Sequence, residues 1–235
     1  MATGVHRQAA IDLDAIIANA RAGTSDLSVC VADLRANAYG HGFAPIVSAL
    51  GEAGVSTFLA SSEEDAALAL SRNPHVRIHV GSSAPDAPAI GLGLYGLGST
   101  PGLLPTLRLS GEVIAVKTIP AGTGVSYGYT YRTSAPTRLA LVALGFADGI
   151  PRVASNRAPV VINGFRALVA GRIAMDQFVV DLGENEAVVG DEAILLGDAT
   201  RGEPTIADWA DAAAVRPEVV LAGLGKRIER VYARA

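Results

Sequence analysis

The chain has 235 residues, a length that normally means one or two domains and allows a sizeable core. Half of the residues are hydrophobic and 18% are charged, which excludes a disordered protein or a charged tail. The net charge is −4, and only Lys117 and Lys226 among the 19 basic residues are lysines, which argues against a nucleic-acid partner. No apolar run is long enough to span a membrane, and one cysteine, Cys30, cannot form an internal disulfide. We therefore expect a cytoplasmic, globular protein without a membrane partner.

Short apolar runs alternate with helical patterns in the first hundred residues. A helix is predicted over residues 11–22, strands are predicted over 27–32, 55–60 and 76–80, and a capping box at 61–64 predicts a helix that ends at Leu70. Strands separated by such helices predict a parallel sheet, either open or closed.

The pattern changes after a glycine-rich stretch at 91–102. Strands are predicted over residues 111–119, 139–145 and 159–169, a helix over 205–214 and a last strand over 227–232. The dipeptide Asn163-Gly164 predicts a type I′ hairpin turn inside the third of these strands. The sequence therefore predicts two domains, an α/β domain at 1–102 and a β-rich domain at 103–235.

Several polar loops could carry chemistry. Residues 35–42, Arg-Ala-Asn-Ala-Tyr-Gly-His-Gly, follow the first predicted strand, where α/β folds place their active sites, although a purely structural turn fits the same residues. The serines and glycines of 79–84 and 90–96 could hold a phosphate through backbone N–H groups, or could serve backbone geometry alone. Tyrosines at every second position of 127–131 would share one face of an extended strand, for sheet packing or for proton transfer. No metal site is predicted.

These clusters, taken together and in this order, closely resemble the alanine racemase family. The resemblance includes the Ala-Asn-Ala-Tyr-Gly-His-Gly loop, Ser-Tyr-Gly at 126–128, residues 144–152, Gly-Arg-Ile-Ala-Met-Asp-Gln at 171–177 and residues 227–232. It implies a pyridoxal 5′-phosphate (PLP) enzyme that interconverts L- and D-alanine and so supplies D-alanine for cell-wall peptidoglycan. It also implies a (β/α)8 barrel followed by a β domain, and a head-to-tail homodimer.

The resemblance assigns roles residue by residue. Tyr127 matches the family's second proton-transfer base, which reaches into the partner's active site. The contacts to the PLP phosphate are matched by Tyr39, Ser83 and Gly91. The substrate-pocket pair on the partner's side is matched by Met175 and Asp176.

Two residues depart from the family around the cofactor lysine. Arg35 occupies the position of the lysine that holds PLP as a Schiff base and serves as the first proton-transfer base. A guanidinium stays protonated at cellular pH and cannot condense with an aldehyde, although it can pair with the PLP phosphate or a substrate carboxylate. Asp33 lies inside the apolar first barrel strand, where an unpaired carboxylate is costly.

The chain is also short for this fold. A (β/α)8 barrel takes roughly 250 residues, but only about 90 lie between the first predicted helix and the β-rich half. The predicted fold class is therefore α/β plus β: a truncated, incomplete TIM-like barrel that forms an open α/β layer, followed by a C-terminal β-rich domain.

Three functional hypotheses follow. The first is a working alanine racemase in which Tyr127 acts with Lys117 or Lys226. The second is a catalytically inactive subunit for dimerisation or regulation, which forms a homodimer or pairs with a full-length racemase. The third is the product of an internally deleted gene that folds poorly.

Overall fold

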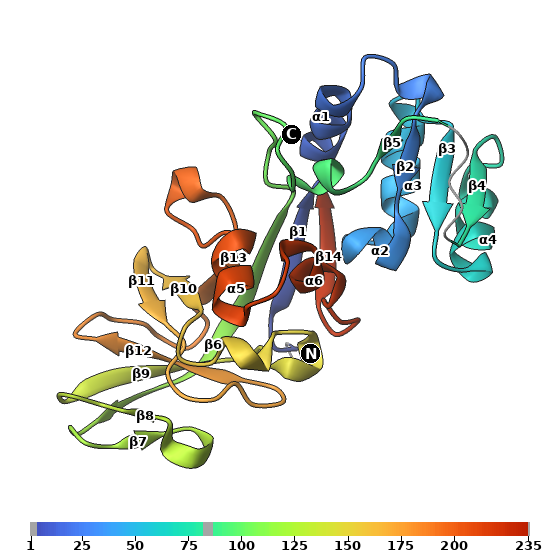
Figure 1. Ribbon diagram of the computed structural model, residues 1–235. Helices are drawn as coiled ribbons and strands as arrows, with labels where there is room; N and C mark the ends of the chain where they lie inside the picture. The colour runs from blue at the N-terminus through green and yellow to red at the C-terminus, as the bar shows by residue number, and fades with distance from the viewer. Residues whose placement is uncertain (1–3, 82–86, 235) are drawn as a thin grey trace. The chain divides into compact units, whose positions relative to one another are not determined.

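A computed structural model describes residues 4–81 and 87–234 (Figure 1). Contacts divide the chain into two units, and each unit takes in one end of the chain. Unit 1 consists of Met1–Ala9 and Arg108–Glu229, and unit 2 of Ala10–Leu107 and Arg230–Ala235. The predicted domain boundary at residue 102 stays a prediction, since the contact division follows Leu107 and assigns both termini differently.

Unit 2 is an α/β layer. Its four-stranded parallel sheet has the order β4-β3-β2-β5, and these strands stand side by side in Figure 1: β2 (Val31–Asp33), β3 (Thr57–Ala60), β4 (Arg77–Val80) and β5 (Ala89–Ile90). The helices are α1 (Leu13–Gly23), α2 (Arg35–Tyr39), α3 (Phe43–Glu52) and α4 (Glu63–Arg72), followed by the 3-10 turn η2 (Leu92–Tyr95). The sheet among the described residues is open, which confirms the truncated barrel.

Local signals explain most of this unit. The Ser62 hydroxyl accepts the Asp65 N–H at 3.1 Å and so begins α4, as the capping box predicts. β3 is buried along its whole length, as a central parallel strand requires. Two predicted elements are wrong in part. Ile11 belongs to strand β1 (Arg7–Asp12) and not to a helix, and the predicted strand over 27–32 splits into the 3-10 turn η1 (Leu27–Val29) and β2.

Unit 1 is built from antiparallel strands. The eight-stranded sheet has the order β11-β10-β13-β6-β1-β14, with β9 paired to β6 and β12 paired to β9. Its strands in unit 1 are β6 (Leu107–Ile119), β9 (Thr137–Val142), β10 (Pro159–Ile162), β11 (Phe165–Leu168), β12 (Phe178–Gly183) and β13 (Glu192–Leu196). Strand β1 is divided between the two units, and β14 (Glu229–Ala233) belongs to unit 2 except for Glu229. A separate hairpin joins β7 (Gly124–Val125) to β8 (Tyr131–Arg132). The helical segments are η3 (Tyr127–Tyr129), η4 (Phe146–Asp148), η5 (Arg152–Ala154), η6 (Ala199–Arg201), α5 (Ile206–Ala213) and α6 (Pro217–Ala222).

Turn and cap residues fix the register of unit 1. Asn163 and Gly164 have φ of 50° and 79°, so the predicted type I′ turn between β10 and β11 is confirmed. The Thr205 hydroxyl accepts the Asp208 N–H and begins α5, as the sequence pattern indicates. Trp209 is buried and donates its indole N–H to the Pro159 carbonyl at 3.0 Å, which ties α5 to β10.

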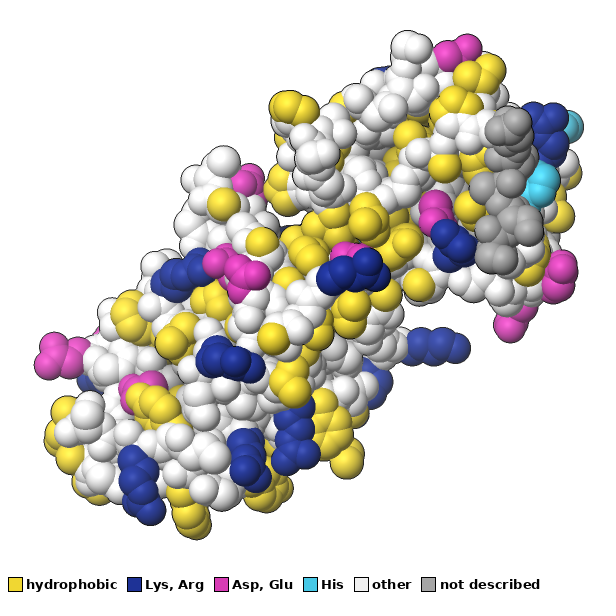
Figure 2. Space-filling view, viewed as in Figure 1, with side chains coloured by type: hydrophobic (Ala, Val, Ile, Leu, Met, Phe, Trp, Pro, Cys, Tyr) yellow, Lys and Arg dark blue, Asp and Glu magenta, His cyan; other side chains and the backbone are white. Residues whose placement is uncertain are grey.

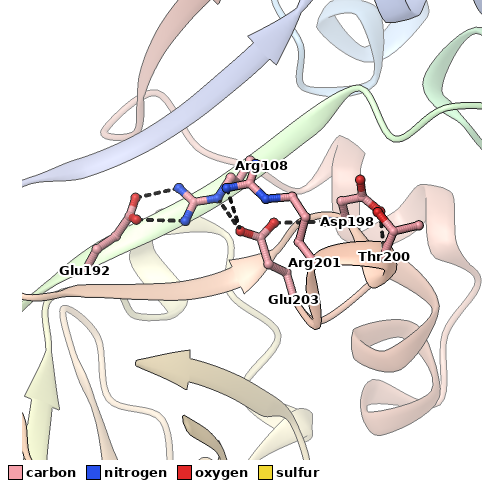
Figure 3. A network of polar contacts seen from close by, with 6 residues as sticks. All are labelled: Arg108, Glu192, Asp198, Thr200, Arg201 and Glu203. Atoms are coloured by element: carbon pink, nitrogen blue, oxygen red, sulfur yellow. Dashed lines mark hydrogen bonds and ion pairs between the residues drawn. The ribbon is translucent and has the colours of Figure 1, made fainter. Parts of the chain in front are cut away.

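An ion-pair network holds β6, β13 and the η6 loop together (Figure 3). The Arg108 guanidinium donates two hydrogen bonds of 2.7 Å to Glu192 and one of 2.8 Å to Glu203. Glu203 is buried, and its other carboxylate oxygen accepts the Asp198 N–H at 3.0 Å. Because Arg108 is the shared donor, its two carboxylate partners keep its pKa above the ordinary value.

The surface gives two further observations. On the face shown in Figure 2, the Lys and Arg side chains form several separate groups among hydrophobic and uncharged surface. That face therefore lacks a continuous basic stripe of the kind that follows a phosphate backbone. Among the described residues, no helix is long and apolar enough to cross a membrane.

Candidate active site

Tyr127 lies on a strained loop of unit 1. The three tyrosines do not share the face that they would have in an extended strand, because Tyr127–Tyr129 form the 3-10 turn η3 and, of the three, Tyr131 alone lies in a strand. Ser126 has φ of 60°, which costs free energy for a residue with a side chain. Its hydroxyl donates to the Arg172 carbonyl at 2.6 Å, and this bond holds the loop. Tyr127 is 69% exposed, so its phenol is available to a ligand or to another chain.

Met175 and Asp176 lie in a tight turn beside this loop. The Ala174 N–H donates to the Gln177 carbonyl at 2.9 Å and closes the turn around them. The Ala147 N–H donates to the Met175 carbonyl at 2.9 Å, and a Cβ at Gly145 would collide with that carbonyl. A cavity of about 310 Å³ lies between the two segments and is lined by Ser126, Tyr127, Leu141, Ala174, Gln177, Phe178 and Val179. Met175 and Asp176 do not line this cavity, but the turn that carries them borders it through Ala174 and Gln177. Tyr127, Met175 and Asp176 thus lie on neighbouring segments of one unit, and we call them the tyrosine half-site.

Two charged residues that the sequence analysis did not single out support this half-site. The Arg227 guanidinium contacts Asp176 at 2.6 Å and Asp148 at 2.9 Å, and the Asp148 carboxylate is fully buried. Both residues stand in segments that carry the family resemblance, at 144–152 and 227–232. A carboxylate inside an otherwise small and apolar loop was the signal that could have identified Asp148.

Arg35 in unit 2 is engaged by Asp33. The guanidinium donates two parallel hydrogen bonds to the Asp33 carboxylate, Nε to Oδ1 at 2.9 Å and Nη2 to Oδ2 at 2.6 Å. The Asp33 carboxylate holds the pKa of Arg35 above its ordinary value. The Asp33 carboxylate is therefore paired, and the cost of an unpaired carboxylate does not arise. Asp33 and Arg35 form one bidentate ion pair, and Arg35 directs its charge at Asp33.

The loop after Arg35 has an unusual backbone. Residues 36–39 all have φ between 47° and 56°, the left-handed helical region, which costs about 1–2 kcal/mol per residue. The surroundings hold this turn: the Asn37 side-chain oxygen accepts the Phe43 N–H at 2.9 Å, and Ser61 accepts the Ala36 N–H at 2.8 Å. His41 is fully buried, bonds Thr106 through Nε2 at 2.9 Å, and has its pKa lowered to about 4 by burial. A neutral, hydrogen-bonded histidine agrees with the structural interpretation of this loop.

The other predicted cofactor contacts of unit 2 lie near Asp33. The Tyr39 ring packs against Tyr95 with centroids 5.1 Å apart, and the Tyr95 hydroxyl donates to the Asp33 carbonyl at 3.0 Å. A Cβ at Gly91 would lie 3.8 Å from the Asp33 Cβ. Arg35, Tyr39 and Gly91 are therefore neighbours, whereas Ser83 lies outside the described residues.

The residues of this chain do not fit a covalently held PLP. Arg35 cannot form the imine, and its guanidinium is already bonded to Asp33. The two lysines, Lys117 on β6 and Lys226 near the start of β14, are exposed and belong to unit 1, not to the α/β layer. No group of three or more His, Cys, Asp or Glu side chains among the described residues could hold a metal ion.

The class of protein is a two-part chain, in which a parallel α/β layer is followed by an antiparallel β domain that carries the tyrosine half-site. Comparison with known sequences identifies the family. Residues 106–232, more than half of the chain, match the family described as the C-terminal domain of alanine racemase. The chain belongs to the alanine racemase family.

Two relatives show how much of a racemase the chain represents. The alanine racemase of Thermobifida fusca is 45% identical over 177 residues, which cover 69% of this chain and 47% of the relative. The alanine racemase of Streptomyces coelicolor is 47% identical over 150 residues, which cover 60% of this chain and 38% of the relative. The chain therefore spans less than half of the length of these curated relatives.

Solved structures agree on the fold. Alanine racemase from a D-cycloserine-producing Streptomyces lavendulae matches with a TM-score of 0.90 and 29% identity, over 98% of both chains. The enzyme of Streptomyces coelicolor matches with a TM-score of 0.89 and 26% identity, over 97% of this chain and 98% of that one. A Bartonella henselae structure with covalently bound pyridoxal phosphate has a TM-score of 0.87 at 20% identity, over 97% of this chain and 99% of that one, and shows the fold alone.

Proposed function

We propose that this chain takes part in the PLP-dependent interconversion of L- and D-alanine as the subunit that supplies Tyr127, while another racemase chain supplies the lysine that holds PLP. The observation that carries the proposal is the unequal state of the two halves. Tyr127, Met175 and Asp176 are exposed, whereas Arg35, which the family resemblance places at the lysine position, is bonded to Asp33. D-Alanine formed in this way would enter cell-wall peptidoglycan.

In this proposal Tyr127 is one of the two proton-transfer bases. PLP held by the partner chain would make the α-proton of a bound amino acid acidic enough to be removed by a base. The Tyr127 hydroxyl would give or take the proton on one face of the α-carbon of alanine, and the partner's lysine would serve the other face. The left-handed Ser126 and its bond to Arg172 supply the positioning that such a transfer needs, because a base acts only at hydrogen-bond reach.

Met175 and Asp176 form the wall of the substrate pocket in this proposal. Both side chains are more than half exposed beside the cavity that Tyr127 lines, so they are available to a molecule held by the partner. A chain with arginine at the position of the PLP-binding lysine needs such a partner, and we propose a heterodimer with a full-length racemase in addition to a homodimer. The buried, unpaired Cys30 thiol supports a reducing compartment, the cytoplasm, for this assembly.

A second candidate is a catalytically inactive subunit that dimerises with or regulates a racemase. The Asp33–Arg35 pair supports it, because the pair satisfies both charges without a ligand. In this case the chain binds its partner but Tyr127 moves no proton.

The experiment mixes this chain with a lysine-bearing alanine racemase chain whose own Ser-Tyr-Gly tyrosine is replaced by phenylalanine. Complex formation is measured by size-exclusion chromatography with light scattering, and racemisation by the D-alanine formed from L-alanine with saturating PLP. The proposal predicts a complex with activity, loss of activity with Tyr127→Phe, and full activity with the matched control Tyr129→Phe. A complex without activity supports the inactive subunit, and the absence of a complex overturns both.

A further inference from the structure

The Asp148 carboxylate is an unusual group to find at the centre of a β domain. Its side chain is fully buried, at the end of η4. Oδ2 accepts the Gly145 N–H at 2.9 Å. Oδ1 lies 2.9 Å from the Arg227 Nε as an ion pair, without hydrogen-bond geometry, and Arg227 Nη2 makes a long hydrogen bond of 3.5 Å to Oδ2. Arg7 contributes a second, longer ion pair of 3.7 Å. A buried carboxylate is tolerated only when it is paired in this way.

Arg227 connects this buried charge to the surface. Its segment is fixed by backbone contacts, because the Gly225 N–H donates to the Asp148 carbonyl at 2.9 Å and Gly149 has no room for a Cβ beneath Gly223. The guanidinium lies between two carboxylates, with Nε toward Asp148 and Nη1 donating to Asp176 Oδ1 at 2.6 Å. The two carboxylates keep the pKa of Arg227 above its ordinary value.

The backbone and the side chain of the 174–177 turn are held by different groups. The backbone is fixed by two bonds to the 145–149 loop, from the Phe146 N–H to the Ala174 carbonyl at 3.0 Å and from the Ala147 N–H to the Met175 carbonyl at 2.9 Å. Among the described residues, the Asp176 carboxylate accepts its side-chain hydrogen bond from Arg227. Removal of Arg227 therefore keeps the two backbone bonds to the 145–149 loop, but it releases the Asp176 side chain and lets the turn around it open more often.

We propose that Arg227 is a positioning residue that fixes the Asp176 carboxylate at the mouth of the tyrosine half-site, and that buried Asp148 holds Arg227 for this purpose. The relevance of this arrangement to alanine rests on the proposed function, in which Asp176 meets the substrate. The chain alone can still test the arrangement, because all three residues belong to unit 1.

The first test is amide hydrogen exchange, read by mass spectrometry on the full chain. The Ala174 N–H, which closes the turn around Asp176, is the reporter. We expect Arg227→Ala to speed its exchange about three- to fivefold, the range of one exposed charge pair, while Arg227→Lys keeps most of the protection. Asp176→Ala alone gives the same increase, and the double variant gives no further increase, because both changes remove one contact. Arg216→Ala, which removes the ion pair between the exposed Arg216 and the largely buried Glu218 on α6, is the control and leaves this amide unchanged.

The second test is kinetic and uses the mixed racemase described above. Arg227→Ala is expected to raise the KM for alanine severalfold with little change in kcat, with partial rescue by Arg227→Lys. An increase in exchange spread over β9 and β12, or an additive double variant, shows that Arg227 only stabilises the fold and overturns the inference. If the mixture with the unaltered chain is inactive, the proposed function fails, and the exchange result still decides whether Arg227 positions Asp176.

Discussion

Replacement of Arg35 by alanine tests whether the α/β layer depends on its ion pair. The Arg35→Ala variant removes both side-chain bonds to Asp33 and leaves that carboxylate with the backbone N–H of residue 35, at 3.1 Å. The Asp33 side chain is 12% exposed, so water replaces the lost guanidinium only in part. We therefore expect unit 2 to lose stability.

The magnitude follows from the burial of the two partners. Loss of one partner from a fully buried pair costs about 3–5 kcal/mol, and loss from a surface pair about 0–1 kcal/mol. Asp33 is nearly buried, but the Arg35 side chain is 39% exposed and the pair is partly screened by solvent. We expect a loss of about 1–2 kcal/mol in the free energy of unfolding. When Asp33→Val is added to the Arg35→Ala variant, the unpaired carboxylate is removed, and we expect most of the lost free energy of unfolding to be recovered.

The assay is urea unfolding followed by two probes. Far-UV circular dichroism reports mainly on α1, α3 and α4 of unit 2, whereas Trp209 fluorescence reports on unit 1. Arg77→Ala is the matched control, because the Arg77 side chain makes two long hydrogen bonds of 3.4 Å to other described residues of the same unit. A midpoint for Arg35→Ala equal to that of Arg77→Ala refutes the reasoning. An Asp33→Val/Arg35→Ala chain whose loss equals the sum of the single losses also refutes it.

Three further predictions concern single buried groups. The pKa of His41 is about 4 in the folded chain and ordinarily 6.5, so the unfolded chain binds the proton first as the pH falls. We expect the stability of unit 2 to be full above pH 6.5 and to fall by about 3 kcal/mol as the pH drops to about 4. Urea titrations across that range measure the fall, which His41→Gln is expected to flatten. Glu203→Ala is expected to lower the free energy of unfolding by about 1–3 kcal/mol in Trp209-monitored urea unfolding, because Arg108 and the Asp198 N–H both lose a buried acceptor; a change within error contradicts this role. Gly145→Ala is expected to displace the 174–177 turn, since its Cβ would meet the Met175 carbonyl; faster exchange of the Ala174 N–H checks this, and unaltered exchange is the contrary result.

Periodicity and turn chemistry predicted the elements that local signals determine. Ser62, Thr205 and the Asn163-Gly164 pair each act within a few residues, so the helix starts and the hairpin were accessible from the sequence. The open parallel layer followed from chain length, because too few residues precede the β-rich half to close a barrel.

The errors have tertiary causes. Ile11 and Asp12 have helical neighbours but lie in β1, which the sheet order places between β6 and β14. The three tyrosines of 127–131 read as an extended face, but Ser126 adopts a left-handed backbone held by Arg172, 46 residues further along. Such long-range bonds leave no local pattern.

In the candidate site, too, the sequence identified residues that stand in recognisable motifs and missed the contacts between distant residues. The resemblance identified Tyr127, Met175 and Asp176 as a group, and the structure brings them to adjacent loops of one unit. The Asp33–Arg35 pair was treated as two separate departures, because a sequence gives no side-chain directions. Arg227 and Asp148 are 79 residues apart, and their ion pair was not predictable from spacing.

The central claim is that this chain lacks the group that holds PLP and contributes the tyrosine side of a racemase site. Intact-mass spectrometry of the purified chain after incubation with PLP and borohydride, followed by peptide mapping, tests it most directly. The account predicts no pyridoxyl adduct beyond the level given by a Lys117→Arg/Lys226→Arg control. A single stoichiometric adduct on Lys117 or Lys226 would contradict the account and identify the lysine of a self-sufficient enzyme.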